Sequence, residues 1–227
     1  MAIILNIDTS TETASVCLAK DGKVLLLQKN DQQKDHAAWL HVAIKQITVD
    51  ATTELSQLNA IAVTIGPGSY TGLRVGLAAA KGICYALENP LIAVNTLLVM
   101  ANAVKNVYED SREESIDFFC PMIDARRMEV FTALYTNNLE VVKEPMALII
   151  DQNSFADELS SKTICFSGTG SAKFKKVINH PNAKFSPVIS DSSAMSALTD
   201  LLYSKKQFAD LAYIEPLYLK EFYTPTR

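Results

Sequence analysis

Short apolar runs separated by turn signals open the chain. Residues 2–7 form an apolar run that ends at Asp8 and suits a buried strand. Two further strands are expected at 13–20 and 23–29, because the Asp21-Gly22 pair between them is a strong hairpin signal. The pattern therefore predicts three antiparallel strands at the start of the fold.

The spacing of apolar residues then alternates between helical and extended periods. Helices are predicted over 36–47, over 70–87 and beyond Thr96, which suits a helix N-cap, with strands over 59–65 and 91–94 between them. Strand-helix-strand units require right-handed parallel crossovers. This half is therefore expected to be a mixed sheet covered by helices.

The second half repeats this order after a charged linker at 110–114. Strands are expected at 118–123, 130–135, 139–148 and 163–167, with helical residues near 155 and over 172–178. Asp124 closes a first strand as Asp8 does. A duplicated α/β lobe of this kind is the organisation of the two-lobed, ribonuclease H-like actin, hexokinase and Hsp70 fold. We therefore expect two lobes with mixed sheets, residues 1–109 and a reduced second lobe at 115–227.

Composition narrows the function classes. The 227 residues include 21 Lys and Arg against 25 Asp and Glu, a formal charge of −4, which argues against a broad surface for nucleic acid or membrane. The four cysteines show no C-x-x-C spacing, so we expect buried thiols rather than a zinc site or disulfides. Because the first residues lack the basic segment of a signal peptide, the expected location is the cytoplasm.

A glycine-rich turn, Gly66-Pro67-Gly68-Ser69, leads from a predicted strand into the helix at 70–87. Backbone N–H groups at a helix N-terminus favour an anion. However, no lysine precedes Lys81 as a P-loop requires, and Thr71 stands where the dinucleotide fingerprint has its third glycine. A structural turn and residual anion binding both stay open. The candidate vestigial phosphate loop consists of Asp8, Thr9, Ser10, Gly66, Gly68 and Ser69.

No complete catalytic or metal site can be assembled from the sequence. His36 and His41 lie about 140° apart on a straight helix, so they cannot share one metal ion. Ser69 lacks the flanking glycines of a nucleophile elbow. We therefore expect no bound metal, no cofactor and no catalytic residue.

The first two predicted helices are apolar almost all round. In the first, one face formed by Leu40, Ala43, Ile44 and Ile47 should pack on the sheet, yet Trp39 and Val42 lie opposite. In the second, small residues would let another helix approach closely. Helices of this kind are buried on both sides, so either the two helices bury one another or a second protein covers them, and we expect the second protein. The expected partner interface comprises Ala38, Trp39, Val42, Gly72, Leu73, Gly76, Ala79 and Ala80.

These features together resemble the TsaB family, also called YeaZ, of bacterial tRNA threonylcarbamoyladenosine biosynthesis. The resemblance spans nearly the whole chain. The segments that carry it are Ile7-Asp8-Thr9-Ser10, His36, residues 66–76 with Lys81-Gly82, Asp124-Ala125-Arg126 and Pro216-Leu217-Tyr218-Leu219. Tyr70 stands where the family often has Phe, a change that keeps the ring.

The resemblance implies a degenerate relative of TsaD, the metal-dependent subunit that transfers threonylcarbamoyl to adenosine 37 of tRNAs reading ANN codons. TsaD has a His-x-x-x-His metal motif in the corresponding helix. Here Leu40 stands four residues after His36, at the position of the second histidine. The implied role is a non-catalytic scaffold that pairs with TsaD through its first two helices, recruits the ATPase TsaE and meets tRNA only through the complex. Without its partner such a chain is expected to form a homodimer.

Two other function classes stay open on the sequence. One is an enzyme, either an ATPase of the actin and sugar-kinase class or a glycoprotease-like peptidase. The other is a nucleic-acid-binding module, which would need a basic stripe that the acidic composition disfavours.

Overall fold

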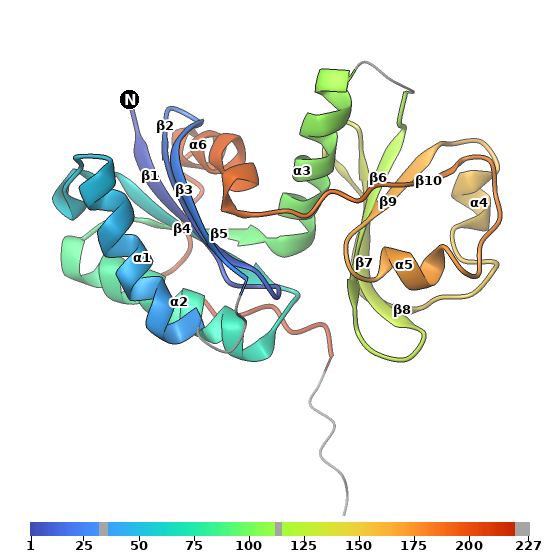
Figure 1. The fold of residues 1–227 in the computed structure, drawn as a ribbon, viewed down its shortest axis with the longest axis horizontal. Helices are drawn as coiled ribbons and strands as arrows, with labels where there is room; N and C mark the ends of the chain where they lie inside the picture. The colour runs from blue at the N-terminus through green and yellow to red at the C-terminus, as the bar shows by residue number, and fades with distance from the viewer. Residues whose placement is uncertain (32–35, 112–114, 221–227) are drawn as a thin grey trace, which may run out of the picture. The chain divides into compact units, whose positions relative to one another are not determined.

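The computed structural model describes residues 1–31, 36–111 and 115–220, with the side chains of 110 and 111 left out (Figure 1). These residues form two units, Met1–Ala103 with Ser190–Pro216, and Val104–Ile189 with the residues from Leu217. The chain runs through β1 (Ile3–Asp8), β2 (Ala14–Lys20), β3 (Lys23–Asn30), α1 (His36–Asp50), η2 (Leu55–Gln57), β4 (Ala60–Gly66), α2 (Tyr70–Leu87), β5 (Leu91–Asn95) and α3 (Thr96–Ser111). It continues through β6 (Phe118–Asp124), β7 (Glu129–Thr136), β8 (Val141–Ile149), α4 (Ala156–Leu159), β9 (Ile164–Ser167), α5 (Ser171–Phe174), β10 (Ala183–Phe185), η3 (Ser192–Met195) and α6 (Ser196–Ser204).

The sheet of the first unit has the order β3-β2-β1-β4-β5. Its first three strands are antiparallel, and β4 and β5 run parallel to β1. Parallel neighbours need crossover connections, which α2 supplies between β4 and β5. The predicted mixed sheet is confirmed.

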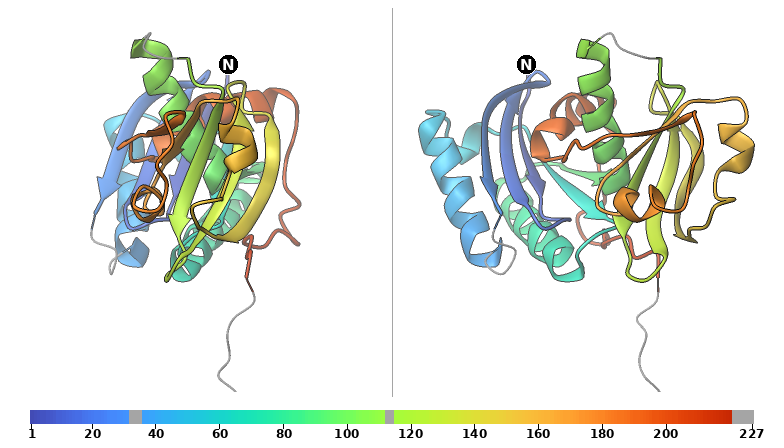
Figure 2. Two further views of the ribbon diagram at one scale, coloured as in Figure 1. Left: turned by 90° about the vertical axis from the view of Figure 1, so that its right-hand side faces the viewer. Right: turned by 45° about the vertical axis from the view of Figure 1, so that its right-hand side comes forward.

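Helices cover both faces of this sheet (Figure 2). Successive strand residues point to opposite faces, so Leu5 and Ile7 of β1 pack with α1 and α2, whereas Ile4 packs with η3 and α6. The face of α1 predicted to meet the sheet is buried. A sheet covered on both sides explains why nearly every residue of β1 and β4 is buried, instead of buried residues alternating with exposed ones.

The second unit repeats the first in strand order. Its sheet is β8-β7-β6-β9-β10, with antiparallel pairs on one side of β6 and parallel pairs on the other. The crossover helices have shrunk to single turns, α4 and α5. A cluster of edge-to-face and tilted rings, formed by Phe155, Phe166, Phe174 and Phe185, fills the space beside the sheet. The predicted duplication with a reduced second lobe is confirmed.

The predicted boundary between the lobes is wrong at the C-terminal end. The sequence assigned all of 115–227 to the second lobe, but 190–216 belongs to the first unit. The physical reason is polar pairing: in the interior, Thr199 of α6 donates to Asn6 Oδ1 of β1 at 2.8 Å, and nearer the surface Asp191 forms an ion pair with Lys29 of β3. Hydrophobic periodicity gives no sign of either contact.

Farther along, this returning segment is fixed to α2 and β5. Lys81 donates to the carbonyl oxygens of Ala212 and Ile214 at 3.2 and 3.4 Å, and Ala209 forms an antiparallel bridge with Leu91. Among the described residues, no helix is both long and apolar enough to cross a membrane.

We predict that Thr199→Val lowers the free energy of unfolding by about 1–3 kcal/mol, because it leaves the buried Asn6 carboxamide without its donor. Thr199→Ser keeps the hydroxyl and is the matched control, expected to lose less. Urea denaturation measures both. Equal losses in the two variants would show that the hydroxyl does not anchor α6.

Candidate functional site

The glycine turn between β4 and α2 is built by local backbone chemistry. Gly66 has φ +121°, a conformation that side chains strongly disfavour. Ser69 then caps α2, since its hydroxyl accepts from Gly72 N at 3.3 Å. The predicted strand-to-helix turn is thus present, with Tyr70 as the first helical residue.

The loop after β1 fills the space in front of this turn. Ser69 N donates to Ser10 O at 2.7 Å, and Thr9 Oγ1 donates to Gly72 O at 2.7 Å. A Cβ added at Gly68 would lie well under 3.0 Å from Ser10 O, and one added at Gly72 would lie as close to Thr9 O. The chain's own carbonyl oxygens therefore stand where an anion would bind. Of the two readings left open by the sequence, the geometry favours the structural turn over residual phosphate binding.

Asp8 is a buried part of the same arrangement. Its Oδ1 accepts from Ser10 N at 3.0 Å, Ser10 Oγ at 2.6 Å and Thr64 Oγ1 at 2.8 Å. Burial raises the pKa of the Asp8 carboxyl, and these hydrogen bonds oppose the shift. With its acceptor oxygen already used by three donors, Asp8 acts as an internal anchor for the loop.

The residues of a TsaD-like metal motif do not fit a metal ion here. His36 is buried, and its Nε2 lies 3.0 Å from Glu12 O. Leu40, at the position of the second histidine, is completely buried in the core. Within the described ranges, no group of three His, Cys, Asp or Glu side chains could hold a metal.

The four cysteines are buried free thiols, as predicted. Burial raises the pKa of Cys17, Cys84 and Cys165 to about 11, and that of Cys120 to about 12. Because the thiolate is the reactive form, none of the four is suited to act as a nucleophile near pH 7.

The small-residue stripe of α2 faces inward, contrary to prediction. Gly72, Leu73, Gly76 and Ala80 are buried against their own unit, and Ala79 is exposed by only 7%. A Cβ at Gly76 would lie well under 3.0 Å from Thr9 Oγ1. Gly72 and Gly76 are small because Thr9, in the loop after β1, passes close to them. Burial within the chain argues against a partner contact for four of the five α2 residues predicted for the interface.

The outer face of the α1–α2 pair is nevertheless apolar. Val42 and Val49 of α1 are 66% and 63% exposed, and Tyr85 of α2 is 83% exposed. Ala38 is also exposed, whereas Trp39 is half-buried and packs against the core. Two of the three α1 residues predicted for the interface thus point outward.

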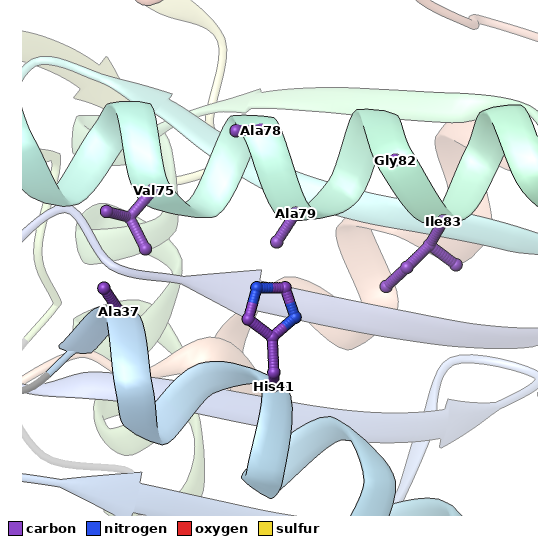
Figure 3. A pocket seen from close by; sticks show the side chains of 7 residues that line it. All are labelled: Ala37, His41, Val75, Ala78, Ala79, Gly82 and Ile83. Carbon is purple, nitrogen blue, oxygen red and sulfur yellow. The ribbon is translucent and has the colours of Figure 1, made fainter.

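A groove of about 390 Å³ separates the two helices on this face. The side chains that line it come from both helices: Ala37, His41, Val75, Ala78, Ala79, Gly82 and Ile83. Figure 3 shows the His41 ring reaching from α1 toward α2, opposite Ala79. We call this surface, with Val42, Val49 and Tyr85, the α1–α2 face.

Gly82 is the residue of this face that the sequence reasoning missed. A Cβ added there would meet nothing within 4 Å, so no intrachain contact requires glycine. Glycine inside a helix costs roughly 0.5–1 kcal/mol relative to alanine. An unexplained glycine six residues after Gly76, and therefore on a different side of the helix, was the available signal.

Comparison with known proteins agrees with this architecture. The family described as "TsaD: tRNA N6-adenosine threonylcarbamoyltransferase" matches residues 27–222. The tRNA threonylcarbamoyladenosine biosynthesis protein TsaB of Buchnera aphidicola subsp. Baizongia pistaciae is 31% identical, over 96% of this chain and 98% of its own. The chain belongs to the TsaD family and, within it, to TsaB. TsaB of Bacillus subtilis is 27% identical over 96% of this chain and 93% of its own.

The TsaB assignment extends to structure. A Pseudomonas aeruginosa crystal structure, described as similar to the peptidase YeaZ, superposes with a TM-score of 0.83 at 25% identity and covers 97% of this chain and 100% of its own. TsaB-family proteins thus share the two-lobed fold, including the reduced second lobe.

We predict opposite effects for two alanine substitutions in α2. Gly76→Ala should lower the free energy of unfolding by about 1–3 kcal/mol, because its Cβ meets Thr9 in a filled site. Gly82→Ala should raise it by about 0.5–1 kcal/mol, because the space there is open. Urea denaturation of both variants is the measurement, and effects of the same sign would contradict the packing described here.

We predict further that Asp8→Asn flattens the pH dependence of stability. Because burial raises the pKa of Asp8 above its ordinary 3.8, the folded chain holds this proton more tightly than the unfolded chain. The free energy of unfolding therefore falls as pH rises above that value toward the raised pKa. The variant should lose less stability than the parent as the pH rises above the ordinary pKa of 3.8. Asp157→Asn, on the exposed side of α4, is the control, and identical pH profiles for all three proteins would refute the prediction.

Proposed function

We propose that this chain is a non-catalytic scaffold of tRNA threonylcarbamoyladenosine formation, which works by binding a TsaD-like catalytic subunit through the α1–α2 face. The observation that carries the proposal is the apolar groove between α1 and α2, floored by Ala79 and left open by Gly82. Its TsaB relatives are named for the biosynthesis of tRNA threonylcarbamoyladenosine. We propose, as the family resemblance implies, that the modified position is adenosine 37 of tRNAs reading ANN codons.

The chemistry of the chain supports a role without catalysis of its own. The glycine turn donates the Ser69 N–H to the carbonyl oxygen of Ser10 instead of to a phosphate, and Asp8 Oδ1 already accepts from three donors. An ATPase needs these groups for nucleotide and magnesium, and a peptidase needs an activated nucleophile. The arrangement of these residues therefore does not support either enzyme alternative, the ATPase or the peptidase.

A helical partner suits the groove by shape and composition. Side-chain ridges of one helix pack into the grooves of another. Burying apolar surface contributes about 25 cal/mol of favourable free energy per Å². Gly82 lets a facing backbone approach closely, and we place the exposed side chains of Val42 and Tyr85 at the rim of the groove. Without a catalytic subunit the same face can pair with itself about a two-fold axis, so homodimer and heterodimer compete. An ATPase of the TsaE type would join the assembled pair.

We predict that Val42→Glu and Gly82→Leu each weaken binding to a purified TsaD-family catalytic subunit at least tenfold, about 1.4 kcal/mol. The glutamate would be desolvated at the rim, and the leucine would fill the space that a partner needs. Isothermal titration calorimetry measures the affinity, and circular dichroism checks the fold.

Leu201→Glu is the matched control, because Leu201 is 50% exposed on α6, on the other face of the sheet. Binding should survive in this variant. Parental affinity in both α1–α2 variants, or threonylcarbamoyl transfer by the purified chain alone, would contradict the proposal. In cells depleted of their own TsaB protein, Val42→Glu should fail to restore threonylcarbamoyladenosine, measured by mass spectrometry of tRNA.

A further inference from the structure

The turn between β6 and β7 is stabilised entirely by groups other than its arginine side chains. Asp124 Oδ1 accepts from Arg126 N at 2.6 Å, and Glu129 N donates to Arg126 O at 3.1 Å. Ala125 N donates to Glu129 O at 3.0 Å. The turn therefore needs no side-chain contribution from Arg126 or Arg127.

Lys173 of α5 fixes this turn from below. Its Nζ donates to Asp124 Oδ1 at 2.9 Å and to the carbonyl oxygens of Arg127 and Glu129 at 2.8 Å each. The Lys173 side chain is only 14% exposed, so the ammonium is held within the structure. The turn is a rigid platform, and both arginine side chains are exposed on it.

The backbone of this platform would suit glycine better than arginine. Arg126 has φ +69° and Arg127 has φ +49°, both in the left-handed region. Side chains disfavour that region, whereas glycine enters it freely. Two consecutive arginines in this conformation indicate that their side chains have a use that outweighs the strain.

The charges of the two arginines are not neutralised within the described part of the chain. Neither guanidinium has a carboxylate partner within 4.0 Å there, because Asp124 is paired with Lys173 and Glu129 with Lys220. The local charge is thus positive on a chain whose formal charge is −4. An anionic ligand is the chemistry that fits.

A hollow of about 730 Å³ lies beside the arginines. Its walls combine cationic and apolar groups, from Ala125, Arg126, Arg127, Met128, Glu129, Ile149 and Lys220. Met128 is 40% exposed and Ile149 is 72% exposed. An apolar surface adjoining two guanidinium groups matches a ligand in which anionic and flat apolar groups alternate.

We propose that this hollow binds RNA directly, with a backbone phosphate on Arg126 and Arg127 and the neighbouring nucleoside against Met128 and Ile149. Guanidinium groups bind phosphate oxygens in a bidentate fork, and the apolar wall receives a base face. An acidic peptide offers charge without a flat apolar group beside each anion, so RNA is the better match. The inference rests on the proposed function in tRNA modification and goes beyond it, because it gives this chain its own contact with RNA.

The test measures fluorescence anisotropy of a labelled, unmodified tRNA transcript titrated with the full chain at low salt. Arg126→Gly with Arg127→Gly should bind roughly tenfold more weakly, and the slope of log affinity against log salt should shrink by about one to two. The same double variant should unfold at a higher Tm, since glycine relieves both left-handed residues. Loss of binding together with gained stability separates a ligand contact from a structural role.

Lys205→Gln with Lys206→Gly is the matched control in the other unit. It also removes two positive charges, and it places glycine at one left-handed position, since Lys206 has φ +54°. This control should bind RNA like the parent. Three results would overturn the proposal: no tRNA binding by the parent chain, equal weakening in both double variants, or competition by polyglutamate as strong as by polyuridylate. A parental association with TsaD in the arginine variant would leave the proposed function standing whichever result is obtained.

Discussion

The packing of the loop after β1 against the first turns of α2 is the contact on which the first unit depends. Thr9 and Ser10 supply a hydroxyl and carbonyl oxygens to that helix, and glycines at 68, 72 and 76 leave the room for them. This contact fixes the direction of α2, which in turn determines how α2 lies beside α1. The apolar face that we propose for partner binding thus depends on a turn whose space is filled by the chain's own loop.

Much of the fold follows from the sequence because its signals are local. The Asp21-Gly22 hairpin, the apolar runs of β1 and β4, and the repeated order of elements all rest on neighbouring residues, and each is present. The return of 190–216 to the first unit could not be predicted, since it depends on Asn6 meeting Thr199 across 193 positions. A polar pair between residues that far apart in the sequence does not alter the hydrophobic periodicity from which elements are predicted.

The candidate site shows the same limit at the scale of one helix. Periodicity identified α2 as apolar on nearly every side, but it does not tell which side the rest of the chain covers. The sequence does not distinguish Gly76 from Gly82. In the structure, Thr9 packs against Gly76, whereas the space beside Gly82 is open. The family resemblance pointed to the two helices as a pair, and only coordinates separate their inward residues from their outward ones.

The matching strand orders of the two sheets make the β1–β2 and β6–β7 connections counterparts within one polypeptide. Both begin at an aspartate, and in both the segment after the fourth strand of the unit donates a hydrogen bond to the connection: Ser69 N, the N-cap of α2, to Ser10 O in one, and Lys173 Nζ of α5 to Arg127 O in the other. The β1–β2 connection begins with buried residues, Asp8, Thr9 and Ser10, whereas Arg126 and Arg127 of the β6–β7 connection are exposed. Two topologically equivalent loops of one chain thus differ in use: one is part of the interior packing, and the other leaves its side chains available to a ligand.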